Sequence, residues 1–176
     1  MANFIADPMS IEDIRQIVKQ IRKKCGLSKI SRVPVCHLFE WILEKLFQEF
    51  DWEIIPDDEM IEEGKTFTGV NKIEIRESVY IDAYNGDGRA RFTIMHELGH
   101  FILHGPEHVA LCRLAPGEKL RPFEDPEWQA DTFAAEILMD FDLIQGMDYK
   151  QISDECGVTY GAAKTRIGKM QGRWIM

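Results

Sequence analysis

The chain has 176 residues, of which 45% are hydrophobic, so it is long enough for one domain with an appendage and a real core. The net charge of −9 argues against nonspecific nucleic-acid binding over the whole surface, although residues 148–176 carry five Lys or Arg against three Asp or Glu. Four widely spaced cysteines indicate reduced thiols, the N-terminus has no signal-peptide pattern, and no stretch is apolar over a membrane-spanning length. We therefore expect a cytoplasmic protein without membrane partners.

Two helices are expected before the first strand, of which the first is amphipathic. Ser10 and Asp13 resemble a capping box at the start of an apolar stripe that runs over residues 11–21. We expect this helix and its linker to occupy residues 1–34 and to pack on the rest of the molecule; binding of a partner protein is the alternative. Residues 35–50 then form a core helix, because their hydrophobic side chains recur at helical spacing.

A small sheet is expected between these helices and residue 88. Residues 52–55, 72–75 and 79–82 have the short hydrophobic or alternating runs typical of strands, and residues 66–69 are a further candidate. The turn sequence at 85–88 ends this region. We expect an antiparallel sheet, and one of its strands is a candidate for pairing with a substrate backbone.

The most informative pattern is His96-Glu97-Leu98-Gly99-His100, an H-E-x-x-H motif within a run of hydrophobic residues at helical spacing. Residues four apart lie on one face of a helix, so the two histidine side chains can reach one metal ion. The carboxylate between them is placed to take a proton from a water molecule, as in a zinc hydrolase. An ordinary solvated helix face is the alternative for so short a pattern.

A third metal ligand is predicted downstream at Glu127. Asp125 and Pro126 are typical of the first positions of a helix, so Glu127 lies in its first turn and Asp131 follows one turn later on the same face. Catalytic zinc sites usually have three protein ligands. Glu127 therefore completes a set of two histidines and one glutamate for one Zn²⁺ per chain. Asp131 is predicted to orient a ligand imidazole by accepting its N–H.

Other polar residues near the motif have weaker assignments. His104 lies about 12 Å along the helix axis from His96, too far to share a metal ion. Cys112 is a candidate inhibitory thiolate, but an inert thiol is the favoured interpretation. Four side chains are candidates for contacting substrate or a transition-state oxygen, each with a structural or surface role as the favoured alternative: Tyr84, Arg91, His104 and His108.

The C-terminal segment, residues 141–176, is predicted to be helical. Residues 149–155 and 159–171 have helical spacing on either side of Gly157, a pattern typical of a helix-turn-helix. A basic cluster on the second helix suggests direct DNA binding: Lys164, Arg166 and Lys169. Packing on the domain, or docking of a repressor, is favoured over DNA binding because this cluster is small.

Residues 91–104 (RFTIMHELGHFILH) and 127–139 (EWQADTFAAEILM) together resemble the ImmA/IrrE family of metallopeptidases. The resemblance implies an α+β, zincin-like fold with a small sheet packed on the active-site helices, for which we expect residues 35–140 as the core. It also implies a zinc site formed by residues already singled out: His96, His100 and Glu127 as ligands and Glu97 as the catalytic carboxylate. Asp140 departs from the family, in which proline commonly follows the Leu-Met pair.

The same resemblance implies a cytosolic, often phage- or mobile-element-linked protease that cuts or inactivates a helix-turn-helix repressor. The sequence thus predicts a zinc endopeptidase with a protein substrate of that class. The alternative is a non-proteolytic transcriptional regulator that binds DNA or a repressor through the C-terminal helices. A protease that is silent until a partner or signal activates it is also compatible with the sequence.

Overall fold

The computed structural model describes residues 5–47, 50–105, 109–110 and 120–172. The helices are α1 (Ile11–Lys24), α2 (Val35–His37), α3 (Glu44–Leu46), α4 (Glu77–Tyr84), α5 (Gly88–Leu103), α6 (Pro126–Leu138), α7 (Tyr149–Cys156) and α8 (Tyr160–Met170), with a π-helical segment η1 (Leu38–Leu43) and a 3-10 turn η2 (Pro122–Glu124). The strands are β1 (Ile5–Ala6), β2 (Asp51–Ile55), β3 (Gly64–Phe67), β4 (Lys72–Arg76) and β5 (Val109–Ala110). Within the described part of the chain, no helix is both long enough and apolar enough to cross a membrane.

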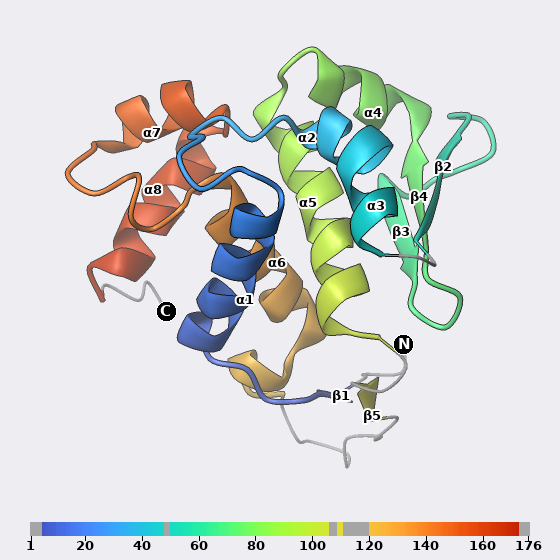
Figure 1. Cartoon of the computed structure of the whole chain (residues 1–176), viewed down its shortest axis with the longest axis horizontal. Helices are drawn as coiled ribbons and strands as arrows, with labels where there is room; N and C mark the ends of the chain where they lie inside the picture. The colour runs from blue at the N-terminus through green and yellow to red at the C-terminus, as the bar shows by residue number, and fades with distance from the viewer. Residues whose placement is uncertain (1–4, 48–49, 106–108, 111–119, 173–176) are drawn as a thin grey trace.

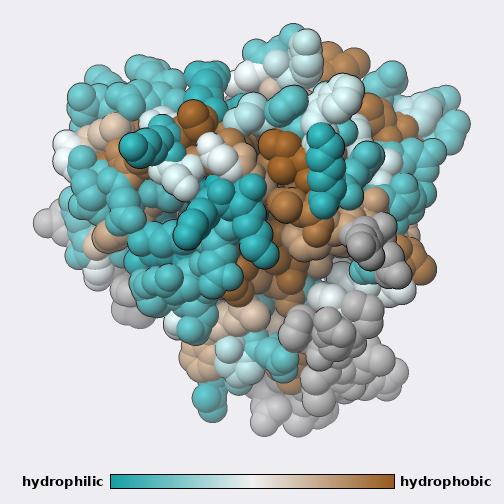
Figure 2. Space-filling model, in the orientation of Figure 1, coloured by the Kyte–Doolittle hydropathy of each residue, from teal (hydrophilic) through white to brown (hydrophobic). Residues whose placement is uncertain are grey.

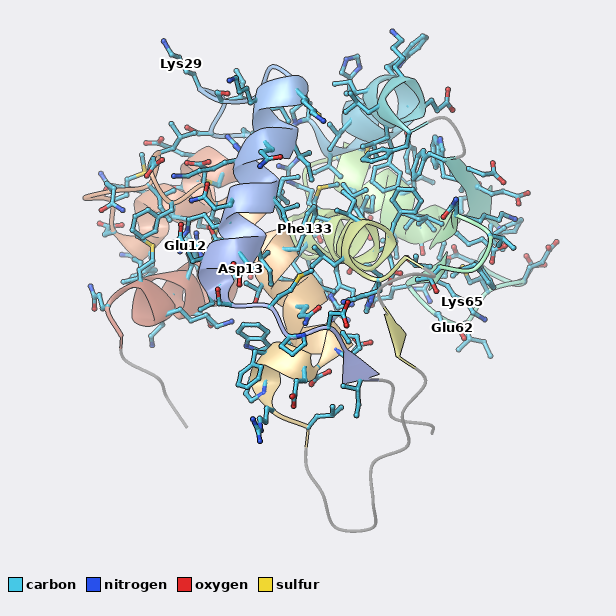
Figure 3. All side chains as sticks on the ribbon, turned by 60° about the horizontal axis from the view of Figure 1, so that its bottom comes forward. Glu12, Asp13, Lys29, Glu62, Lys65 and Phe133 are labelled. Atoms are coloured by element: carbon cyan, nitrogen blue, oxygen red, sulfur yellow. The ribbon has the colours of Figure 1, made fainter. Side chains whose placement is uncertain are left out.

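Helix α5 lies at the centre of the molecule, with α1 and α6 on one side and the three-stranded sheet on the other (Figure 1). Its side chains Ile94, Met95 and Leu98 are buried, and Phe133 of α6 is buried beside them in the same hydrophobic cluster. Figure 3 shows Phe133 among the helices at the centre. The helix that carries the H-E-x-x-H motif is therefore also the main packing surface of the fold.

Polar side chains cover the outer faces of the surrounding elements. Figure 3 shows Lys29 at the edge of the molecule and Lys65 toward the side of the sheet, and both are exposed, as is Glu12 of α1. Figure 2 shows hydrophilic residues over α1 and over the region of α7 and α8, next to a band of hydrophobic residues near the centre of this face. The amphipathic pattern of α1 fits this arrangement, because Ile14 and Val18 are buried in the core whereas Glu12 is exposed.

The three-stranded sheet has the order β2-β4-β3, in which β2 is parallel and β3 antiparallel to β4. The predicted α+β fold class is confirmed, but the expectation of an antiparallel sheet is wrong for β2, and the sheet is mixed. The predicted strand at 79–82 is part of α4, because Val79 and Ala83, four residues apart, are buried on one helix face. The chain therefore continues from β4 into a helix. The two edges of β4 have different partners, with β2 parallel on one edge and β3 antiparallel on the other.

The C-terminal helices form a helix, a tight turn and a helix, as the sequence predicts. Gly157 ends α7 in the left-handed conformation (φ 65°), which favours glycine. This unit packs closely on the start of α5: a Cβ on Gly88 would lie 2.7 Å from the carbonyl carbon of Val158. The buried side chain of Arg91 donates hydrogen bonds to the carbonyl oxygens of Gly157 and Cys156. The C-terminal unit is therefore fixed to the motif helix.

Glu136 joins three helices through a buried cluster of charges. Its carboxylate is bound by Arg166 of α8 (Nη2–Oε2 2.7 Å) and by Arg15 of α1 (Nη2–Oε1 3.0 Å). Burial opposes the ionised carboxylate, but the two guanidinium groups outweigh burial and lower the pKa of Glu136. Arg166 is 3% exposed, so it is not available to DNA. The basic cluster on α8 that suggested DNA binding therefore loses Arg166.

One hydrophobic cluster includes side chains from all three predicted segments of the chain. Ile14 comes from residues 1–34, Ile94 from residues 35–140 and Ala163 from residues 141–176. The division into an N-terminal helix, a peptidase core and a C-terminal segment stays a prediction about the sequence. In the folded chain these segments pack on one another.

Candidate metal centre

Three side chains from two helices bring their ligand atoms to one point. His96 and His100 lie on consecutive turns of α5, and their Nε2 atoms are 3.0 Å apart. Glu127 lies in the first turn of α6; its Oε2 is 3.4 Å from Nε2 of His96, and its Oε1 is 3.5 Å from Nε2 of His100. The ligand atoms of these three residues all lie within 4.8 Å of one another. The two segments that the sequence analysis connected are therefore adjacent in the structure.

The spacing of these atoms fits a metal ion of the size of zinc. Ligands that bind zinc tetrahedrally at about 2.0–2.1 Å are separated from one another by about 3.3 Å, close to the distances found between the three side chains. The site also attracts positive charge. The neighbouring imidazoles of His100 and His96 hold the pKa of Glu127 well below its usual range. Burial opposes protonation of His96, but its contacts with Asp131 and Glu127 outweigh burial and raise its pKa to about 9.

Close packing of α5 on α6 places the carboxylate of Glu127 beside the histidines. A Cβ on Gly99, inside the motif, would lie 3.1 Å from the Cα of Ala130, so glycine permits the two helices to approach. Asp125 caps α6 by accepting a hydrogen bond from the backbone N–H of Glu127 at 3.0 Å, which fixes the first turn. The side chain of Glu127 is 72% exposed, so the site opens to solvent on one side.

Each imidazole has a partner on its second nitrogen. Nδ1 of His96 lies 2.9 Å from Oδ1 of Asp131, in the arrangement that the spacing of Glu127 and Asp131 predicts. Nδ1 of His100 instead lies 2.9 Å from Nδ1 of His104, a contact that the sequence analysis did not predict. In both rings Nδ1 is thus engaged away from the site, and both Nε2 atoms are directed into it.

Glu97 lies beside this centre at the wall of a cleft of about 520 Å³, which is also lined by His96 and Phe92. Strand β3 holds its side chain in place: the hydroxyl of Thr66 is 2.7 Å from Oε2 of Glu97. A Cβ on Gly64 would lie only 2.6 Å from Cγ of Glu97. Neither contact follows from a pattern in the sequence, where the one local signal is the glycine that begins this short strand.

The family relationship follows from a comparison with protein-family models. The model of the IrrE N-terminal-like domain, Peptidase_M78, matches residues 48–167, more than half of the chain. The chain belongs to this family. The resemblance to ImmA/IrrE proteins is thereby confirmed: the chain is a metallopeptidase of the IrrE-like family, and family membership implies a divalent metal. Its candidate ligands are His96, His100 and Glu127. No curated protein matched the chain.

Asp140, which the resemblance marked as a departure from the family pattern, lies just after the end of α6. The helix stops at Leu138. The Asp140 carboxylate then accepts hydrogen bonds from the backbone N–H groups of Asp142 and Leu143, and it pairs with Nε of the buried Arg22 at 3.2 Å. These contacts hold the turn that follows α6.

The structure separates the remaining candidates from the cleft of this IrrE-like domain. Arg91 is 5% exposed and binds backbone carbonyls, so its role is in packing. His104 is 2% exposed, and burial lowers its pKa to about 4, so it is a neutral buried group and not a surface that a substrate can reach. Tyr84 is 74% exposed, but it does not line the cleft. His108 and Cys112 lie outside the described residues.

Proposed function

We propose that this IrrE-like metallopeptidase is a zinc endopeptidase that cleaves a helix-turn-helix repressor. One observation carries the proposal: His96, His100 and Glu127 form an open set of three ligands, with the carboxylate of Glu97 in the adjoining cleft. Two histidines and one glutamate are the ligand set of many zinc peptidases, whereas structural zinc sites are normally closed by four ligands that include cysteine.

The reaction requires one acid–base group besides the metal. When bound, zinc would lower the pKa of its water ligand and polarise the carbonyl group of the peptide. Glu97 accepts the proton of the attacking water on its carboxylate and transfers it to the nitrogen of the leaving amine. The Thr66 hydroxyl, bonded to Oε2, keeps this carboxylate turned toward the cleft. Asp131 holds the ring of His96 so that Nε2 faces the ligand position.

An extended peptide segment is the substrate form that the cleft accepts. Strand β3 pairs with β4 on one side only and has no other strand partner among the described residues, so its second edge can pair with a peptide backbone. Gly64 of β3 and Ala162 of α8 line the same cleft, which places the C-terminal unit beside the bound segment. The chain's net charge of −9 favours association with basic, DNA-binding proteins.

The DNA-binding alternative loses its main support. It requires an exposed basic surface on α8, yet Arg166 is buried against Glu136, Lys169 is partly buried, and Lys164 is the one exposed member of the cluster. An acidic chain with a single exposed lysine at this position lacks the phosphate contacts on which DNA affinity depends.

Co-expression tests the proposal. Wild type and Glu97→Gln are each produced with the helix-turn-helix repressors encoded beside the gene, and Glu155→Gln, an exposed carboxylate on α7, serves as the control. We expect a repressor fragment with wild type and control, and at least about 100-fold less with Glu97→Gln. A fragment formed equally by Glu97→Gln refutes the general base. Absence of any repressor fragment with zinc-loaded wild type refutes the substrate class.

A further inference from the structure

The third histidine of the motif helix, His104, has no role in the chemistry above, yet it is buried and both of its ring nitrogens have polar partners. It ends α5 and is 2% exposed. Its Nδ1 lies 2.9 Å from Nδ1 of His100, and its Nε2 lies 2.9 Å from Oε1 of Gln129. Gln129, on α6, is completely buried. A series of buried hydrogen bonds therefore connects Gln129 of α6 with His100, a predicted metal ligand on α5.

The donor–acceptor direction of these hydrogen bonds is fixed by Gln129. The side-chain nitrogen of Gln129 lies 2.8 Å from the backbone carbonyl oxygen of Asp7 and 2.8 Å from that of Phe123. Carbonyl oxygens only accept hydrogen bonds, so the NH₂ group of Gln129 must point toward them. Its Oε1 then faces His104 and can only accept. Consequently Nε2 of His104 must carry a proton and donate it.

The position of the proton on His104 determines the position of the proton on His100. A neutral imidazole has one N–H donor and one acceptor nitrogen. Because Nε2 of His104 donates to Gln129, its Nδ1 is the acceptor, and the proton in the contact at 2.9 Å belongs to Nδ1 of His100. The Nε2 lone pair of His100 is then free and directed at the point where Nε2 of His96 and the Glu127 carboxylate converge.

We propose that His104 and Gln129 are positioning residues that fix the tautomer and ring orientation of His100 for metal binding. The inference rests on the proposed function in so far as His100 is a zinc ligand. The two ligand histidines are thereby held differently. Asp131 holds His96 with a carboxylate, whereas His104 holds His100 without adding a second negative charge. Gln129 also joins η2 and the segment before α1 to the start of α6, where Glu127 lies.

Ring-nitrogen NMR of the zinc-loaded, ¹⁵N-labelled protein tests the tautomer directly. We expect His104 to be neutral with its proton on Nε2, and His100 to carry its proton on Nδ1. A proton on Nδ1 of His104 would reverse the direction of these hydrogen bonds and overturn the proposal. This measurement uses the wild-type protein, so it does not depend on the folding of any variant.

Zinc affinity tests the energetic effect, by competition with a chromogenic chelator. His104→Leu removes the acceptor for His100, and we expect about 10- to 100-fold weaker binding. In His104→Gln the amide oxygen accepts from His100 and the amide nitrogen donates to Gln129, so we expect affinity within about threefold of wild type. The unfolding curve of each metal-free variant shows how much of the effect is structural.

The outcomes separate this inference from the proposed function. Wild-type affinity in folded His104→Leu, together with loss of zinc in His100→Ala, would overturn the positioning role and leave the metal site intact. Normal zinc binding by His100→Ala would contradict the metal site itself. Equal loss in His104→Leu and His104→Gln would contradict the donor–acceptor order on which the inference depends.

Discussion

Strand β3 approaches the carboxylate of Glu97 so closely that a single methyl group decides where the carboxylate lies. In Gly64→Ala the added Cβ would lie 2.6 Å from Cγ of Glu97, so the side chain must move away from the cleft wall. A misplaced general base loses most of its contribution, and we expect at least about a tenfold fall in kcat with unchanged zinc content.

Gly69→Ala is the matched control, because a Cβ on Gly69 meets nothing within 4 Å. Peptide-cleavage rates and zinc content are measured for both variants. Full activity of Gly64→Ala would show that the position of Glu97 does not limit the reaction. Loss of activity in Gly69→Ala as well would show that the effect belongs to the loop and not to the contact with Glu97.

At the scale of elements, the distance between α5 and α6 sets the metal site. In Gly99→Ala the new Cβ would lie 3.1 Å from Cα of Ala130, a backbone atom that moves only with its helix. We expect α6 to shift outward, carrying Glu127 away from the histidines, and zinc affinity to fall by about tenfold or more. Gly161→Ala on α8, where the nearest atom is 3.9 Å away, should leave zinc affinity unchanged. Equal zinc affinity in Gly99→Ala and Gly161→Ala would contradict the claim that the spacing of α5 and α6 controls metal binding.

Local patterns in the sequence were sufficient for the features that depend on neighbouring residues. The H-E-x-x-H spacing predicts two histidines on one helix face, and the Asp125-Pro126 cap places Glu127 in a first turn, where the structure has it. The pattern at 79–82 was too short to distinguish a strand from a helix turn. The structure has a helix there, with Val79 and Ala83 buried against the core.

Contacts between distant segments could not be predicted in this way. The direction of β2 relative to β4 depends on pairing that residues 51–55 do not encode by themselves. Thr66 meets Glu97 from 31 residues away, and Gln129 meets His104 from 25 residues away. Neither pair has a characteristic spacing, so Thr66 and Gln129 were missing from the predicted site.

For the whole molecule, the pairing of Glu136 with Arg15 and Arg166 joins the N-terminal helix, the peptidase helices and the C-terminal unit. Glu136→Gln takes the paired carboxylate from the buried guanidinium of Arg166 and one of the two carboxylates from Arg15, and we expect the free energy of unfolding to fall by about 3–5 kcal/mol. Glu12→Gln removes the exposed carboxylate that binds the same Arg15 and should cost less than about 1 kcal/mol. Denaturant unfolding measures both; equal losses would contradict a structural role for the buried cluster.

The same cluster gives a prediction for acid unfolding. Ion pairing lowers the pKa of Glu136 in the folded protein, so its stabilising effect is complete above the ordinary value of 4.5 and is lost as the pH falls further. Between about pH 5 and pH 3, the free energy of unfolding should decrease more steeply in wild type than in Glu136→Gln. Parallel pH profiles for the two proteins would contradict a depressed pKa at this carboxylate.

X-ray absorption by the zinc-loaded protein tests most directly whether His96, His100 and Glu127 share one metal ion. We predict one zinc per chain, bound only by nitrogen and oxygen at about 2.0–2.1 Å, with the scattering of two imidazole rings. In Glu127→Gln or His100→Ala this signal should be lost or altered. A sulfur ligand at about 2.3 Å, or an unchanged spectrum in both variants, would contradict the proposed centre.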